Sequence, residues 1–442
     1  MYLTDRSAAP AADTGPGRRR GRRPRITPVV LVLGTVSLIT DISSEMVTAV
    51  LPLYLVATLG LSPLAFGALD GVYNGVSALV QLTGGHLADR MRNHKLLAGL
   101  GYGLSALCKP LLLFAGSVGT LGTVLALERT GKGLRTAPRD AMISLSTPPA
   151  HQGRAFGVHR AMDTTGAMLG PLAAFLILSV AADGYDAVFG VSACVAALGV
   201  IVLVLFVPGR RRAPSTDTTG GAGEAGTSDA RPPVRLREAL ALLRLRQLRA
   251  LICCAALLGL TTVSDAFVYL LLQRRAGVGE EWFALLPLGT AVVFLLLAVP
   301  MGALADRTGR HIVFLAGHLG LLTAYVLLLW APATPLLVPL VLALHGMFYA
   351  ATDGVLPAAL AGIVPEHLRA SGLALVGTSQ ALARFCCSLG FGAAWATWGD
   401  GPALAASAIG LLCCATVAGP VLRPGRRIGR PPSQPDEQQG PL

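Results

Sequence analysis

The sequence predicts an all-α integral membrane protein with twelve transmembrane helices, arranged as two pseudo-symmetric halves of six. Hydrophobic residues make up 53% of the 442 residues and charged residues only 14%, whereas soluble domains carry about 25% charged residues. The chain also contains twelve predominantly apolar stretches, each at least as long as the roughly 20 residues that cross a bilayer. Two short motifs recur at nearly equal spacing in the two halves of the chain. Together these observations favour a duplicated bundle of membrane helices.

The expected spans are apolar stretches separated by short polar connections. We expect the first six near 28–57, 63–86, 96–116, 118–146, 155–181 and 185–207, and the second six near 249–273, 282–304, 311–331, 335–362, 371–396 and 402–422. Composition then divides the chain into a disordered basic tail (1–27), a first bundle (28–208), a hydrophilic linker (209–248), a second bundle (249–423) and a second tail (424–442).

The placement of basic residues predicts the topology. Arg and Lys occur in nearly every connection on the side of the N-terminal tail. The opposite connections lack them, apart from Arg274 and Arg275. By the positive-inside rule, both tails and the linker are cytoplasmic. The net charge of +12 therefore indicates orientation in a lipid bilayer and not nucleic-acid binding. The basic residues are almost all Arg, which suggests a GC-rich bacterial genome. We expect a monomeric multi-pass protein of the bacterial cytoplasmic membrane.

An internal repeat supports the division into halves. The segment Gly85–Arg90 matches Gly302–Arg307 at an offset of 217 residues, and Arg154–Gly157 matches Arg369–Gly372 at an offset of 215. Each pair occupies equivalent cytoplasmic connections, after the second and fourth spans of its half. Duplicated six-helix halves are typical of secondary transporters.

Sequence signatures of an enzyme or a metal protein are absent. The eight cysteines lie in apolar stretches without Cys-x-x-Cys spacing, so we interpret them as small packing residues. The chain contains no phosphate-binding loop, nucleophile elbow or His-Glu-x-x-His motif. We therefore expect no enzymatic activity, no cofactor and no metal site.

Three motifs resemble those of the major facilitator superfamily over about residues 28–423. The loop motif between its second and third helices is matched in the second half by Gly302, Leu304, Ala305, Asp306, Arg307, Gly309 and Arg310. In the first half it is matched by Gly85, Leu87, Ala88, Asp89 and Arg90, whereas Arg92, Asn93 and His94 replace its usual ending.

The other two motifs lie in the fourth and fifth spans. The Arg-x-x-x-Gly pattern of the fourth is present as Arg129 and Gly133, with Lys132 where a neutral residue is usual. The fifth-helix pattern of exporters and antiporters is matched by Gly157, Gly166, Gly170 and Pro171, although its last two glycines are replaced. These residues suit close helix packing and a bend. The segments 41–46 and 131–140 also resemble a bacterial subgroup, which narrows the family but not the cargo.

The resemblance implies that spans 1, 4, 7 and 10 line a central cavity, and each of these four carries charge. Charges at membrane depth are costly and are interpreted as functional. Asp41 and Glu45 lie one turn apart on one face. Proton-coupling candidates are Asp41, Glu45 and Glu128, since a desolvated carboxylate can hold a proton. Candidates for contact with the cargo are Arg129, Lys132, Asp265 and Asp353. In the alternative interpretation, the two acids of span 1 are ion-paired to span 4 or hydrogen-bonded, without titrating during transport. Arg129 and Lys132 are the expected partners in span 4.

The loop-motif residues and the remaining charges of span 4 are assigned to gates near the cytoplasmic surface, or to contacts made in folding. These candidates are Gly85, Asp89, Arg90, Arg135, Arg139, Asp140, Gly302, Asp306, Arg307 and Arg310. Four intramembrane charges cannot be divided between cavity and packing from the sequence: Asp70, Lys109, Asp163 and Arg384. The isolated histidines, among them His345, are interpreted as packing residues.

The leading functional prediction is a secondary active transporter that exports small organic molecules, such as drugs or metabolites, in exchange for protons. The fifth-helix motif and the mid-membrane acids favour export, and the cationic fourth span suits an anionic or zwitterionic cargo. The alternative is a symporter or facilitator that imports a metabolite. A non-transporting membrane sensor is a remote alternative of another class, because no soluble signalling domain is evident.

Overall fold

Helices dominate the part of the chain that the structure describes, and no β-strand occurs in that part. The computed structural model describes residues 27–90, 94–148, 152–181, 184–207, 242–353, 360, 364 and 369–422. The predicted tails lie outside these residues, apart from Thr27, and so does the predicted linker up to residue 241.

Six long helices fill the first half of the chain. They are α1 (Pro28–Leu53), continued by a π-helical turn (Tyr54–Thr58), α2 (Pro63–Arg90), α3 (His94–Leu111), α4 (Val118–Leu145), α5 (Gln152–Val180) and α6 (Gly184–Phe206). Local sequence explains where some of them begin. Pro28 occupies the first turn of α1, where its missing N–H costs nothing. Ser117 and Thr120 exchange side-chain and backbone hydrogen bonds at the start of α4, which satisfies amides that lack helical partners.

The second half contains six corresponding segments. They are α8 (Arg246–Gly259) with α9 (Asp265–Ala276), α10 (Glu280–Phe283) with α11 (Leu286–Thr308), α12 (Arg310–Trp330), α13 (Leu337–Thr352), α15 (Arg369–Trp398) and α16 (Asp400–Leu422). Two details differ from the sequence prediction. The seventh span is two helices and not one, and α8 begins at Arg246, inside the segment predicted as linker.

The break in the seventh span leaves residues 260–264 without regular helix. Backbone groups in a membrane need internal hydrogen-bond partners. The Val263 amide donates to the hydroxyl of Tyr325 on α12 at 2.8 Å, and the Tyr325 side chain is fully buried. A neighbouring helix therefore satisfies an amide that the break exposes.

Seven helices of the described chain are long and apolar enough to cross a membrane, judged by length and composition. Three of the other predicted spans have identifiable reasons for failing this test. The seventh span is divided, α13 has only 16 residues, and α4 carries its charges between Glu128 and Asp140. A test based on hydropathy thus misses a span such as α4, whose charged side chains gather on one helix.

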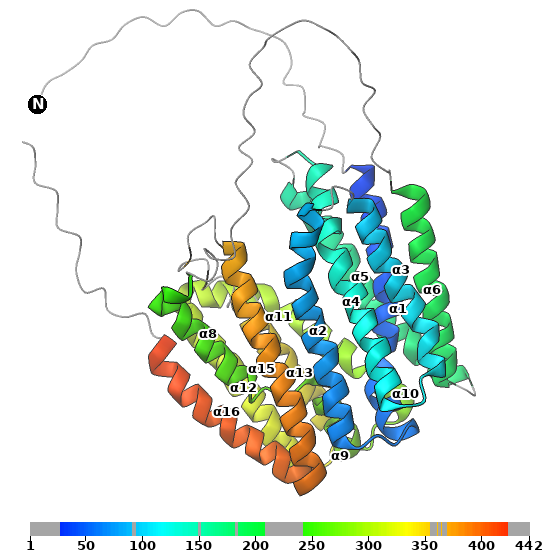
Figure 1. The fold of residues 1–442 in the computed structure, drawn as a ribbon. Coiled ribbons are helices and arrows are strands. Elements are labelled where there is room, and N and C mark those ends of the chain that lie inside the picture. Colours follow the sequence, from blue (N-terminus) through cyan, green and yellow to red (C-terminus); the bar gives the residue numbers. More distant parts are fainter. Residues whose placement is uncertain are drawn as a thin grey trace, which may run out of the picture.

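The two halves lie side by side, with α2 against α15 (Figure 1). Their contact is close because glycines face each other: a Cβ added to Gly67 would lie 3.2 Å from the Gly392 Cα. Nearby, the Ser388 hydroxyl donates to the Asp70 carboxylate at 2.6 Å. A further link joins Tyr185 on α6 to Glu280 on α10 at 3.1 Å. These contacts lie at the end of the bundle opposite the start of α1 (Figure 1).

Candidate functional site

The charged residues of α4 between Glu128 and Asp140 form what we call the charged stripe. Its first part, nearest the start of α4, is a buried cluster. The Glu128 carboxylate accepts a hydrogen bond from Lys109 Nζ at 3.1 Å and lies 2.7 Å from Arg129 Nε. The Arg129 guanidinium also stacks 3.6 Å from the centre of the Tyr73 ring. All three charged side chains are almost completely buried. Glu128 is therefore held between two cations, and Lys109, which the sequence left unassigned, is one of them.

The middle of the stripe bridges α4 to α1. Lys132 Nζ donates to Glu45 Oε1 at 3.4 Å, and Arg135 Nη2 donates to Asp41 Oδ1 at 3.2 Å. The expected pairing of Glu45 with Lys132 is confirmed. The expected pairing of Arg129 with an acid of α1 is wrong, because Arg129 contacts Glu128 instead.

The two bridging pairs differ in their access to water. The side chains of Arg135 and Asp41 are 4% and 12% exposed, whereas those of Lys132 and Glu45 are 29% and 26% exposed. The Arg135 guanidinium also lies over the Tyr102 ring, 4.4 Å from its centre. The pair of Glu45 and Lys132 is thus partly accessible to water, while the pair of Asp41 and Arg135 is enclosed.

The last part of the stripe centres on Arg139. Its Nε donates to Asp140 Oδ1 at 3.0 Å, and its Nη1 donates to the Ser37 hydroxyl at 3.2 Å. Arg139 Nη1 also lies 3.6 Å from Asp163 on α5, which the sequence left unassigned. Arg139 thereby connects α4 to α1 and α5.

Two glycines of the fifth-helix motif lie directly against α1. A Cβ added to Gly170 would lie 2.7 Å from Glu45 Cβ, and one added to Gly166 would meet the backbone of Leu38. Pro171 is buried beside them. Gly157 has no neighbouring heavy atom within 4 Å of such a Cβ. Gly166 and Gly170 therefore bring α5 close to the turn of α1 that carries Glu45.

The loop motif between α11 and α12 lies on the surface. Asp306 and Arg307 are exposed, and Arg310 Nη2 lies 3.8 Å from Asp306. Gly309 joins the two helices with a φ of +109°, which favours glycine. Gly302 lies on α11, and an added Cβ would have no neighbour within 4 Å. In the first half, Gly85, Asp89 and Arg90 lie on the last turns of α2, where their side chains are outside the described part.

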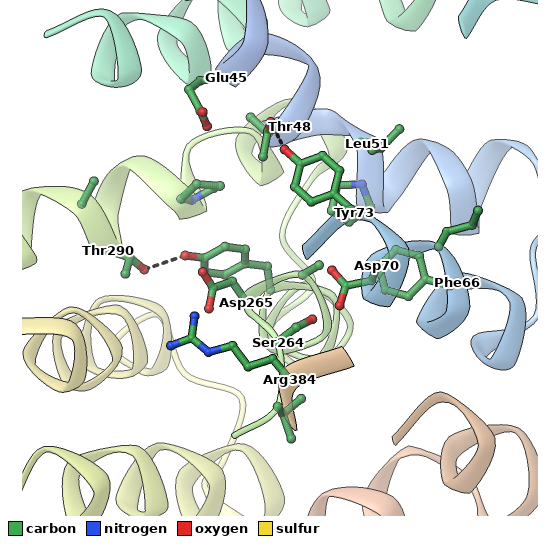
Figure 2. Close-up of a pocket in the computed structure, with 18 of the residues that line it drawn as sticks. Glu45, Thr48, Leu51, Phe66, Asp70, Tyr73, Ser264, Asp265, Thr290 and Arg384 are labelled. Carbon is green, nitrogen blue, oxygen red and sulfur yellow. Dashed lines mark hydrogen bonds between the residues drawn. The ribbon is translucent and has the colours of Figure 1, made fainter. Parts of the chain in front are cut away.

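A cavity of about 370 Å³ lies between the two halves. Its walls come from α1, α2 and α4 of the first half and from α9, α11, α13 and α15 of the second. Figure 2 shows Glu45, Asp70, Asp265 and Arg384 around this space. Of the residues predicted to contact cargo, Asp265 and Asp353 line the cavity. Arg129 and Lys132 are not among its lining residues.

Asp265 belongs to a hydrogen-bonded cluster of the second half. It is the first residue of α9, and its Oδ1 accepts from the Tyr349 hydroxyl at 2.6 Å and lies 3.0 Å from His345 Nε2. His345 is fully buried, but it is a polar partner and not the packing residue predicted. Its spacing of four residues from Tyr349 places both on one face of α13, and this signal could have revealed the pair.

The cavity also includes residues that the sequence prediction did not assign to it. Asp70 from α2 and Arg384 from α15 bring charge, and Tyr73 and Tyr269 bring aromatic rings whose hydroxyls bond to Thr48 and Thr290 (Figure 2). Spacing along the chain could show that Asp70 and Arg384 are intramembrane charges. It could not show which way their helices face.

Comparisons with known proteins agree with this architecture. The model of the Major Facilitator Superfamily matches residues 33–385 and 282–441. An uncharacterized MFS-type transporter of Methanocaldococcus jannaschii is 29% identical over 375 residues, which cover 83% of this chain and 88% of that protein. An uncharacterized protein of Mycobacterium tuberculosis is 33% identical over 162 residues, or 37% of this chain and 39% of that protein.

Solved structures share the fold at low sequence identity. The nucleoside transporter NupG has a TM-score of 0.72 and 12% identity, with 90% of this chain and 100% of that chain covered. A bacterial homolog of the human lysosomal transporter Spinster, in an inward-facing and unoccupied conformation, has a TM-score of 0.66 and 16% identity, with 91% and 95% covered. The family match and the shared fold together lead to one conclusion: the chain belongs to the Major Facilitator Superfamily and is a twelve-helix, multi-pass membrane transporter.

Proposed function

We propose that the protein is a proton-coupled exporter of small organic molecules that works by alternating access. The observation that carries this proposal is the position of Glu45. Its carboxylate lines the cavity between the halves and is also the partner of Lys132 on α4. A proton and a cargo molecule can therefore reach the same side chain.

The proposed coupling follows from the chemistry of this ion pair. A protonated Glu45 no longer attracts the Lys132 ammonium, so protonation releases the contact between α1 and α4. The enclosed pair of Asp41 and Arg135 stays formed and keeps the two helices in register. Loss of the proton restores the Glu45 pair. Protonation leaves the partly buried Lys132 ammonium without its partner, and this changes the balance between conformations.

Alternating access is supported by the contacts between the halves. They are close where α2 meets α15 and where α6 meets α10, at the end of the bundle opposite the start of α1. With both termini in the cytoplasm, as the distribution of basic residues favours, this end is the outer one. The proposal then describes a monomer in the cytoplasmic membrane that is closed on its outer side.

The expected consequence of replacing Glu45→Gln is loss of transport driven by a pH gradient, while the fold is retained. Glutamine keeps the size of the side chain but cannot exchange a proton. Cargo can first be found from the sensitivity of an expression host to a panel of drugs and metabolites, with and without an uncoupler. Proton release on addition of that cargo is then followed with a pH-sensitive dye in proteoliposomes.

The matched control is Asp186→Asn, which neutralises an exposed carboxylate at the start of α6 and should leave coupling intact. Full proton-coupled transport by the Glu45 variant would remove Glu45 from the mechanism. Export is distinguished from metabolite import by comparing inverted with right-side-out vesicles under the same gradient. Uptake confined to right-side-out vesicles with an acidic exterior would identify an importing symporter.

A further inference from the structure

The charge of the central cavity differs from the charge of the stripe on α4. The four cations of that stripe each have a carboxylate partner at close range: Glu128 for Arg129, Glu45 for Lys132, Asp41 for Arg135, and Asp140 for Arg139. None of these four cations is among the residues that line the cavity. The stripe therefore does not supply positive charge to a cargo molecule.

The cavity walls are instead acidic. Four carboxylates line the cavity, and Arg384 is the single Lys or Arg among its described lining residues; the carboxylates are Glu45, Asp70, Asp265 and Asp353. Lys132 on α4, which does not itself line the cavity, neutralises Glu45. Arg384 is attracted to both aspartates of the second half, and its one charge can balance only one of them.

Neither Asp265 nor Asp353 has a Lys or Arg within ion-pair distance in the described structure. Asp265 receives the Tyr349 hydroxyl and the His345 ring on the same oxygen, Oδ1, and its Oδ2 has no such partner. Asp353 directly follows the last residue of α13, and its carboxylate makes no hydrogen bond within the described residues. In addition, the Ser264 hydroxyl beside Asp265 is buried without a partner. These polar groups leave room for a ligand that brings positive charge or N–H donors.

The remaining walls suit the apolar part of such a ligand. They carry five aromatic rings together with aliphatic side chains; the rings are those of Phe66, Tyr73, Tyr269, Phe294 and Tyr349. Aromatic faces attract cations as well as apolar groups. The volume of about 370 Å³ falls in the range of small-molecule sites.

We propose that the cargo is an amphiphilic organic cation whose charged group binds between Asp265 and Asp353. This inference rests on the proposed transport function and adds the class of cargo. It reverses the expectation of an anionic or zwitterionic cargo, which followed from the cations of α4 before their partners were known. The apolar part of the cargo lies against the aromatic walls, and Arg384 opposes binding because it repels the cation.

The test is equilibrium binding of two ions of nearly equal shape and opposite charge to the purified protein. Tetraphenylphosphonium is the cationic probe and tetraphenylborate is its anionic match. Each probe is equilibrated by dialysis with the protein in detergent micelles, and with empty micelles as the control for partitioning into detergent. We expect saturable binding of the cation and none of the anion. Binding at equilibrium requires no gradient, so its outcome is independent of the direction and of the coupling ion of transport.

Variants of the charged cavity residues show whether each residue attracts or repels the bound cation. Asp265→Asn and Asp353→Asn should each weaken binding of tetraphenylphosphonium by at least about fivefold, because a nearby opposite charge is lost from a partly dry site. Arg384→Gln should tighten it by about threefold or more, because a like charge is removed. Asp186→Asn, on the outer surface, should bind as the parent protein does. Each variant is first checked for a single size-exclusion peak at the parent position.

Three results would overturn the inference. They are binding of tetraphenylborate as tight as that of the cation, absence of saturable tetraphenylphosphonium binding by folded protein, and weaker binding in the Arg384→Gln variant. The last result would identify Arg384 as a ligand for an acidic group and the cargo as anionic or zwitterionic. If Asp265→Asn does not fold, Asp353→Asn and Arg384→Gln still decide the sign. Cation binding that persists in Glu45→Gln without proton coupling would separate the cargo class from the coupling mechanism.

Discussion

Replacement of Glu128→Gln is expected to lower the stability of the folded protein severely. Glu128 is the carboxylate partner of both Lys109 and Arg129, and its side chain is 3% exposed. Glutamine would leave the two cations close together without a negative charge between them. Removing one partner of a buried ion pair costs about 3–5 kcal/mol. The loss can be measured as the decrease in apparent melting temperature of detergent-solubilised protein, followed by size-exclusion chromatography after heating.

A second substitution separates this explanation from a direct role of Glu128 in coupling. Adding Lys109→Met to Glu128→Gln removes one of the stranded cations and should recover part of the lost stability, a positive interaction in a double-mutant cycle. Asp186→Asn provides a surface carboxylate change of the same kind. A Glu128→Gln protein as stable as its parent, yet unable to couple transport to protons, would restore Glu128 as a coupling residue.

Replacement of Gly170→Val is expected to disrupt the packing of α5 on α1. An added Cβ would lie 2.9 Å from the Ile42 carbonyl oxygen and from the Met46 nitrogen, and these backbone atoms cannot turn aside as a side chain can. Overpacking of this kind costs about 1–3 kcal/mol. The displaced turn of α1 also carries Glu45. The variant should therefore show a lower melting temperature and lower proton-coupled activity in the fraction that still folds.

The matched control lies on the same helix. Gly157→Ala places a Cβ where no heavy atom lies within 4 Å, and alanine is a better helix former than glycine by up to about 1 kcal/mol. Its stability should equal or slightly exceed that of the parent. Equal loss of stability in both variants would attribute the effect to helix propensity or expression and not to the contact with α1.

Much of the fold could be predicted from the sequence because span length and hydrophobicity are local properties. The break between α8 and α9 could not be predicted in this way. Residues 260–264 contain neither Gly nor Pro, and the amide of Val263 is satisfied by Tyr325, which is distant along the chain. The tertiary hydrogen bond that stabilises the break cannot be read from the hydrophobicity of one span.

The same distinction applies to the candidate site. The spacing of Asp41 and Glu45 predicts that both acids share a face, and the partner of Glu45 is on α4 as expected. The choice of Arg135 over Arg129 as partner of Asp41 depends on how far α4 is shifted along its axis relative to α1. The inclusion of Asp70 and Arg384 in the cavity depends on the rotation of α2 and α15. Neither quantity is encoded in residue spacing within one helix.

The divided seventh span has a mechanical consequence. Its first piece, α8, packs against α15 and α16 at the periphery, whereas α9 contacts α1, α11, α12 and α13 near the centre. Five residues of irregular backbone separate the two pieces, so α9 can tilt without rotating α8 as a rigid rod would. Asp265 stands at this joint as the first residue of α9. A tilt of α9 together with the central helices would therefore move Asp265 in the cavity wall, while α8 keeps its packing against α15 and α16.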